Sequence, residues 1–136
     1  YNVDLIDIAA DDSKLLNFLR MEKWLADRPH HPGAAAKQWL IDLYKNNLLI
    51  KGEFVLAGDK VNLKTITMPV LNIYAERDHI LPPPCYKALK KYVGSKDYTE
   101  LSLPSGHVGI YVSSRLQAVV SDSIFTWLSK RQSAVR

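Results

Sequence analysis

The sequence predicts an α/β fold in which parallel strands are joined by helices. Three observations carry this prediction. From Pro69 onward, the segments follow the order strand, loop, helix, strand, loop, helix. Residues 69–75 form a short and almost continuous apolar run, which is typical of a strand buried in a parallel sheet. The segment after Ser114 has strong helical periodicity, and alternation of this kind indicates strands joined by right-handed crossovers.

The first third of the chain is predicted to be helical. One helix covers about residues 14–28 and follows Asp11–Ser13, whose side chains can cap its free backbone N–H groups. The proline-rich segment 28–33 ends it, because proline restricts the residue that precedes it. A second helix is predicted over about residues 34–46, where apolar side chains recur at helical spacing.

Strand patterns begin near Glu53. Apolar residues alternate on both sides of Gly58-Asp59, which predicts a hairpin with a two-residue turn. The remaining predicted elements are the strand 69–75, a helix over about residues 85–92, the strand 97–103 and a final helix. Ser114 and Gln117 match a capping box at the start of that helix.

Two parallel strands need neighbours and helices on both faces to form a stable sheet. We therefore expect further strands before Tyr1, and the absence of an initiator Met fits a sequence that begins inside a longer chain. The composition changes near Glu53, which predicts two parts, residues 1–52 and residues 53–136.

Composition narrows the classes of function. The hydrophobic share of 47% and charged share of 24% are those of ordinary globular proteins. The net charge of +4 could attract an anionic partner, but no basic stripe is interleaved with aromatic residues, so nucleic-acid binding is not expected. A single cysteine fits a reducing compartment. No apolar run approaches the roughly 20 residues of a transmembrane helix, and the N-terminus lacks the pattern of a signal peptide.

Asp78 and His107 are the candidate catalytic residues. Each follows a predicted strand, and the ligand crevice of an open α/β sheet lies at the carboxyl ends of its strands. Gly106 and Gly109 permit backbone turns that would present His107 into a cleft. A carboxylate on one imidazole nitrogen holds a single tautomer, so the other nitrogen can accept a proton from a nucleophile. A surface aspartate in a loop is also a common solvated residue, so the pair alone is a weak signal.

Longer motifs make the signal specific. They are Asn17–Trp24 (NFLRMEKW), Leu49–Glu53 (LIKGE), Met68–Glu76 (MPVLNIYAE), Asp78–Pro83 (DHILPP) and Ser105–Ser113 (SGHVGIYVS). Together they resemble polyhydroxyalkanoate synthases, α/β-hydrolase-type enzymes that polymerise hydroxyacyl-CoA thioesters. The DHILPP and SGH segments resemble the family's catalytic acid and histidine motifs, so the resemblance assigns those roles to Asp78 and His107.

The resemblance implies an acyltransferase in which an upstream cysteine is acylated by a (R)-3-hydroxyacyl-CoA and the growing polyester chain is transferred onward with release of CoA. His107 would be the general base. Asp78 would orient His107 or assist the incoming hydroxyl, and the sequence does not choose between these roles. No metal or prosthetic cofactor is implied, because CoA is part of the substrate.

The segment GHVGIYVS with MEKW is closer to the two-subunit (class III) synthases than to the large single-subunit ones. This similarity implies a second synthase subunit as partner, a homo-oligomer, and a cytoplasmic enzyme at the surface of polymer granules. It also implies that residues 1–52 are part of a cap subdomain, and that residues 53–136 are the C-terminal part of the hydrolase core.

The family's nucleophile is a cysteine in a Gly-x-Cys-x-Gly turn, which this chain lacks. Cys85 follows three prolines at a predicted helix start, where a thiol pKa can fall, but it comes after the acid and is interpreted as a packing residue. His79 adjoins the acid and could touch substrate. His30 and His31 have no further metal ligands at suitable spacing. The three tryptophans are predicted to be core residues, namely Trp24, Trp39 and Trp127.

Two other functions stay open at this point. A serine-dependent esterase or thioesterase would use the same Asp78 and His107, and the residue in the missing nucleophile turn would decide between them. Alternatively, the 136 residues could be an inactive fragment that only binds a partner.

Overall fold

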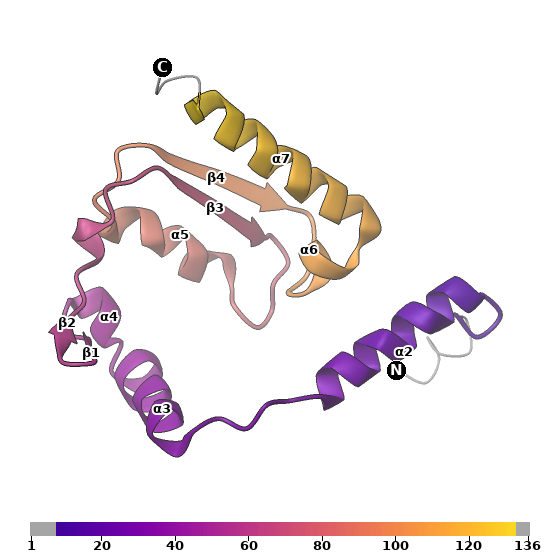
Figure 1. The fold of residues 1–136 in the computed structure, drawn as a ribbon, viewed down its shortest axis with the longest axis horizontal. Helices are drawn as coiled ribbons and strands as arrows, with labels where there is room; N and C mark the ends of the chain where they lie inside the picture. The colour runs from indigo at the N-terminus through magenta and orange to yellow at the C-terminus, as the bar shows by residue number, and fades with distance from the viewer. Residues whose placement is uncertain (1–7, 133–136) are drawn as a thin grey trace. The chain divides into compact units, whose positions relative to one another are not determined.

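The computed structural model describes residues 8–132 of the chain. Contacts between residues divide the chain into two units, residues 1–41 and residues 42–136, which are described separately here. The fold is a mixture of helices and small sheets, as predicted for the α/β class (Figure 1).

The first unit contains helix α2 (Asp12–Ala26). The Asp11 carboxylate caps it by accepting hydrogen bonds from the backbone N–H groups of Ser13 and Lys14, both at 3.1 Å. An acceptor here is favourable because the first N–H groups of a helix have no partner within it. The predicted cap is therefore confirmed and belongs to Asp11, whereas Asp12 and Ser13 lie inside the helix.

The second predicted helix changes its winding halfway. Residues Gly33–Gln38 form α3, and residues Trp39–Lys45 continue as a π-helix, η1. The prediction of one α-helix over 34–46 was thus wrong in its second half. A π-helix needs about one more residue per turn than an α-helix, so an apolar spacing of three and four residues cannot distinguish the two over seven residues.

Between this helix and the main sheet lie short elements. The helix α4 (Leu48–Lys51) ends at Gly52, whose φ of 68° is a conformation that glycine adopts without strain. The strands β1 (Val55–Leu56) and β2 (Asp59–Lys60) form an antiparallel hairpin. A short 3-10 helix, η2 (Leu63–Thr65), follows and ends the predicted alternation of apolar residues.

The hairpin turn lies one residue earlier than predicted. Leu56 pairs with Asp59, so Asp59 belongs to β2 and the turn residues are Ala57 and Gly58. Their φ values are 52° and 94°, as a two-residue turn with positive φ at both positions requires. The sequence pointed to Gly58-Asp59 because that dipeptide is a common turn signal, but the pairing register determines the position.

The main sheet has two parallel strands, β3 (Val70–Ala75) and β4 (Tyr98–Leu103). They pair in register along their full length, from Val70 opposite Tyr98 to Ala75 opposite Leu103. Helix α5 (Pro83–Tyr92) connects them, which confirms the predicted strand, helix, strand order. In parallel strands the carboxyl ends meet at one edge, so the loops after β3 and β4 are neighbours.

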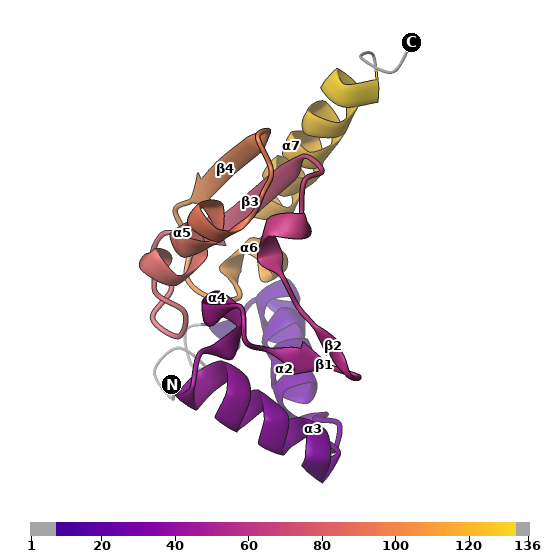
Figure 2. The same cartoon turned by 90° about the vertical axis from the view of Figure 1, so that its left-hand side faces the viewer.

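Helices lie on both sides of this sheet. Figures 1 and 2 show α5 on one side and α7 (Ser114–Gln132) on the other. The Trp127 indole N–H of α7 donates to the Thr99 hydroxyl of β4 at 3.1 Å. Arg131 pairs with Asp97 just before β4, with Nε to Oδ2 at 2.8 Å. These contacts fix α7 against β4.

The start of α7 differs from the predicted capping box. Ser114 is the first residue of the helix, and the amide of Gln117 donates to the carbonyl of Tyr111 rather than reaching back to Ser114. The reason is the short helix α6 (Gly109–Val112), which was not predicted and which brings the Tyr111 carbonyl close to Gln117.

The buried core lies at the carboxyl ends of the strands. Ala75, Leu103 and Ile110 form its centre, from β3, β4 and α6 respectively. Partly buried side chains from the strands and α7 surround them, namely Ile73, Leu101 and Val120. The core therefore supports the two loops that carry the candidate site. Within residues 8–132, no helix combines the length and apolar character needed to cross a bilayer.

Candidate active site

Asp78 and His107 meet beyond the ends of β3 and β4. The backbone hydrogen bonds of the sheet continue past both strands, with Glu76 N–H donating to the Leu103 carbonyl and Arg77 N–H to the Ser105 carbonyl, each at 2.9 Å. These bonds hold the two loops side by side. His107 Nδ1 then lies 2.8 Å from Asp78 Oδ2, although 29 positions separate the residues. The expected convergence of the pair is observed.

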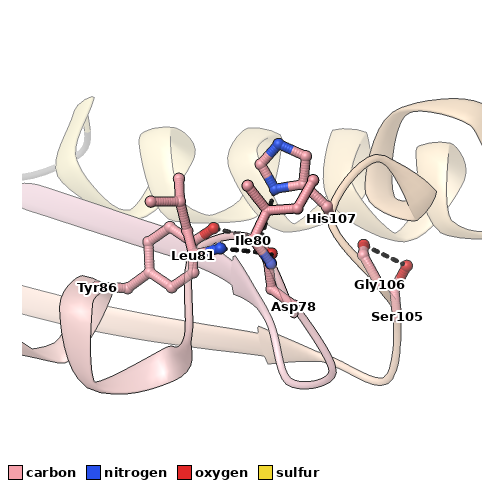
Figure 3. A network of polar contacts seen from close by, with 7 residues as sticks. All are labelled: Asp78, Ile80, Leu81, Tyr86, Ser105, Gly106 and His107. Atoms are coloured by element: carbon pink, nitrogen blue, oxygen red, sulfur yellow. Dashed lines mark hydrogen bonds and ion pairs between the residues drawn. The ribbon is translucent and has the colours of Figure 1, made fainter.

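The Asp78 carboxylate is almost fully buried and accepts hydrogen bonds on both oxygens (Figure 3). Oδ1 accepts from the backbone N–H groups of Ile80 at 2.9 Å and Leu81 at 2.8 Å. Oδ2 accepts from the Tyr86 hydroxyl at 2.5 Å and also faces His107 Nδ1. The side chain of Asp78 is only 1% exposed. A buried carboxylate needs such partners, because removing it from water is otherwise costly.

These partners keep Asp78 ionised. Burial by itself raises the pKa of the carboxyl, but the hydrogen bond from Tyr86, those from the backbone at Leu81 and Ile80, and that from His107 together lower it. The net effect holds the pKa of Asp78 well below its ordinary value of 3.8. A carboxylate with a depressed pKa is a permanent hydrogen-bond acceptor and a weak proton acceptor at neutral pH.

Tyr86 is the residue of this cluster that the sequence did not single out. It lies in the first turns of α5, eight residues after Asp78, and its ring stacks on Tyr74 of β3 with centroids 5.7 Å apart. Burial and the neighbouring Asp78 carboxylate raise the pKa of Tyr86 to about 12, so the phenol stays protonated and donates. Its only sequence signal is a tyrosine at the start of the helix that follows the acid loop.

His107 is held from one side and open on the other. Its side chain is 37% exposed, and Figure 3 shows the second ring nitrogen directed away from Asp78. The carboxylate fixes a proton on Nδ1, so the neutral imidazole presents Nε2 as an acceptor. The arrangement can therefore take a proton from a nucleophile at Nε2 while Asp78 stabilises the imidazolium that forms.

In the histidine loop, Gly109 is needed for the room that it leaves to a neighbouring side chain, not for an unusual backbone conformation. The chain turns between Gly106 and Gly109, with the N–H of Gly109 donating to the Gly106 carbonyl at 3.1 Å, but neither glycine has a positive φ. A Cβ at Gly109 would lie 2.0 Å from the Ser105 hydroxyl oxygen, and Ser105 is buried. Gly109 is therefore needed because α6 packs directly on Ser105.

Other candidates lie apart from the pair. Cys85 is exposed on α5, and in the described part of the chain it forms no hydrogen bond with His107. His79 is exposed in the acid loop, and His31 stacks on Trp39 with ring centroids 5.9 Å apart. Trp24 and Trp39 are 60% and 49% exposed, so the prediction that they are core residues was wrong for these 136 residues. Trp127 is half-buried against β4.

Comparison with known proteins supports the motif resemblance. The chain is 48% identical over 129 residues to the poly(3-hydroxyalkanoate) polymerase subunit PhaC of Allochromatium vinosum, a match covering 95% of this chain and 36% of that protein. It is 47% identical to the subunit of the same name from Synechocystis, covering 96% of this chain and 35% of the relative. The subunit of Haloferax mediterranei is 36% identical over 95% of this chain and 26% of its own length.

The chain thus spans about a third of the length of the first two relatives, whose coverages are 36% and 35%. No model of a protein family matches it, and no solved structure matches it. The chain is related, over nearly its whole length, to one part of the poly(3-hydroxyalkanoate) polymerase subunits.

Proposed function

We propose that the whole protein is an acyltransferase that polymerises (R)-3-hydroxyacyl-CoA into polyhydroxyalkanoate and releases CoA, and that Asp78 and His107 are its acid and base. The 2.8 Å contact between Asp78 and His107 at the ends of two parallel strands carries this proposal. The relatives named poly(3-hydroxyalkanoate) polymerase subunits support it.

In the proposed mechanism, a cysteine outside these 136 residues is the nucleophile. His107 Nε2 takes the thiol proton, and the thiolate attacks the thioester carbonyl. The C–S bond to CoA then breaks, and the departing CoA thiolate takes the proton from the imidazolium, which leaves an acyl-enzyme and free CoA. Transfer of the acyl group to a hydroxyl follows, with His107 accepting the hydroxyl proton and returning it to the cysteine.

Asp78 orients His107 in this proposal and does not deprotonate the incoming hydroxyl. Both of its oxygens already accept hydrogen bonds, and its side chain is 1% exposed. Its depressed pKa also makes it a poor base. A base for the hydroxyl must come within hydrogen-bond reach of it, and His107 is the exposed member of the pair.

The remaining parts of the proposal concern the whole molecule. We propose that residues 53–136 are the C-terminal part of an α/β-hydrolase core, because β3, α5 and β4 form a parallel unit that carries the acid and the histidine at its strand ends. Residues 1–52 would belong to a cap over the active site. The protein would act in the cytoplasm at the granule surface, as a homo-oligomer with a second synthase subunit.

The product distinguishes a polymerase from a hydrolase. The full-length polypeptide, incubated with (R)-3-hydroxybutyryl-CoA, is assayed for CoA release with a thiol reagent and for polymer by precipitation and methanolysis. We expect CoA release to be matched by polymer. CoA release matched instead by free 3-hydroxybutyrate would establish a thioesterase and contradict the proposal.

A further inference from the structure

The oxygen of Asp78 that faces His107 has a second donor. Tyr86 places its hydroxyl 2.5 Å from Oδ2, and His107 Nδ1 lies 2.8 Å from the same atom. The opposite oxygen, Oδ1, is occupied by two backbone N–H groups. The negative charge that Asp78 presents to the imidazole is therefore shared with a phenol.

The position of Tyr86 is fixed by contacts from β3. Its ring stacks on the buried Tyr74, with 14° between the ring planes. The Asn72 amide donates to the Tyr86 carbonyl at 3.1 Å, which fixes the backbone of α5 at this residue. Side chains held on rigid elements by such contacts keep a site in one geometry. The phenol thus reaches Asp78 from helix α5, whose position is fixed by contacts with β3.

We propose that Tyr86 is a positioning residue for the Asp78–His107 pair: its hydroxyl fixes the orientation of the carboxylate and reduces the negative charge that Oδ2 presents to the imidazole. The inference rests on the proposed function of that pair. Reduced charge on Oδ2 weakens the attraction between the carboxylate and an imidazolium at His107, so the strength of this attraction depends on the Tyr86 hydroxyl.

Other ionisable groups surround the cluster. Cys85 on α5 and Tyr111 on α6 lie close enough for their negative charge, when ionised, to raise the pKa of Tyr86. Arg77 donates to the Pro104 carbonyl at the base of the histidine loop, and His79 lies exposed in the acid loop. None of these four groups forms a hydrogen bond with Asp78 in the described part of the chain, so Tyr86 is, beside His107 itself, the side chain whose removal changes the carboxylate directly.

The first test removes the hydroxyl in the full-length polypeptide by Tyr86→Phe. The acidic limb of the pH profile of kcat/KM for CoA release reports the imidazole of the free enzyme. We expect this limb to move upward by roughly half a pH unit or more, because the carboxylate regains charge toward His107. We also expect the plateau of kcat to fall by about tenfold with little change in KM, as for a loss of orientation.

The second test strengthens the donor without removing it. A 3-fluorotyrosine introduced at position 86 carries a more acidic phenol, which donates more strongly, so the acidic limb is expected to move downward. This replacement keeps the ring stacked on Tyr74 and remains informative if Tyr86→Phe fails to fold. The control is Tyr92→Phe on the same helix, whose hydroxyl does not bond Asp78 and which should leave the limb in place.

A direct titration separates this inference from the proposed function. The imidazole of His107 is titrated by NMR in the same full-length variants, which requires no turnover. Shifts of opposite sign for Tyr86→Phe and for 3-fluorotyrosine support the inference even if the wild-type enzyme releases no CoA, an outcome that would contradict only the proposed function. An unshifted His107 titration in both position-86 variants would overturn the role of Tyr86.

Discussion

Asp78 has two duties at the level of the single residue. It closes the turn of its own loop by accepting the N–H groups of Ile80 and Leu81 on one oxygen, and it orients His107 with the other. Both duties need an ionised carboxylate, because a protonated acid would lose an acceptor at a buried position. Structure and chemistry at this residue therefore depend on the same charge.

The first prediction concerns activity. Asp78→Asn keeps the size of the side chain but replaces one oxygen by an NH₂ group, which donates hydrogen bonds and cannot accept them. The side chain can then no longer accept hydrogen bonds from Tyr86 and His107 while its other oxygen accepts those of the backbone. We expect kcat for CoA release to fall by about 10³–10⁴-fold, as expected when the histidine tautomer is no longer fixed. The control is Asp97→Asn, which breaks the ion pair with Arg131 outside the site and should leave kcat within about twofold.

The second prediction concerns acid stability. Because the folded pKa of Asp78 lies below its ordinary value of 3.8, its charge stabilises the fold above that pH, and this contribution is lost as pH falls through the folded pKa. The difference in free energy of unfolding between wild type and Asp78→Asn should shrink as pH falls from about 5 to about 2. Denaturant titrations at several pH values measure it. A constant difference would show that the pKa of Asp78 is the same in the folded and in the unfolded protein.

At the level of elements, the site depends on how two loops are fixed to one short sheet. The pairing of β3 and β4 continues through the N–H groups of Glu76 and Arg77, beyond the strand ends. The core of Ala75, Leu103 and Ile110 lies at the same ends of the two strands. The acid and the histidine are thus positioned by the most regular part of the molecule.

The third prediction tests the packing of the histidine loop. Gly109→Ala places a Cβ 2.0 Å from the hydroxyl oxygen of Ser105, so we expect a destabilisation of about 1–3 kcal/mol in denaturant unfolding. Adding Ser105→Ala removes that oxygen and should restore most of the loss. Gly33→Ala is the control, because nothing lies within 4 Å of its added Cβ. Equal effects at positions 33 and 109 would show that packing on Ser105 is not the cause.

The sequence predicted elements well where periodicity alone determines them. The strands 70–75 and 98–103 each begin one residue later than predicted and end as predicted. It failed where a choice depends on partners outside the segment. The hairpin turn moved because the register pairs Leu56 with Asp59, and the capping box at Ser114 was replaced by a contact between Gln117 and Tyr111. These partners lie in strand β2 and in helix α6, and the spacing of apolar residues does not encode the contacts with them.

The same limit applies to the site. Asp78 and His107 were found because each follows a strand and lies in a motif, and strand order brings such residues together. Tyr86 could not be found this way, because its role depends on the orientation of α5 against β3. Gly109 was noticed for its flexibility, whereas its function is to leave room for Ser105.

At the scale of the whole molecule, the chain spans about a third of the length of the first two relatives, and large apolar side chains stay exposed on several helices, including Trp24, Trp39 and Phe125. A nucleophile turn of the Gly-x-Cys-x-Gly type is absent from the 136 residues. In our account, activity requires a longer polypeptide that adds a nucleophilic cysteine to the acid and the base.

The fourth prediction follows from the absence of a nucleophile turn in the 136 residues. Residues 1–136 produced alone should release no CoA from (R)-3-hydroxybutyryl-CoA, because no activated nucleophile accompanies the pair. The assay is the thiol-reagent measurement used for the full-length polypeptide. CoA release by the 136 residues that is abolished by Cys85→Ser would show that the exposed thiol of α5 is the nucleophile.

The most direct measurement of the central claim is the rate of CoA release by full-length His107→Ala, compared with His79→Ala as a matched control. His107 Nδ1 contacts Asp78 at 2.8 Å, whereas His79 is exposed in the neighbouring loop. We predict a loss of at least about 10³-fold in kcat for His107→Ala and a change within about twofold for His79→Ala, with both proteins folded. Normal polymer formation by His107→Ala would contradict the assignment of the base and, with it, the proposed catalytic pair.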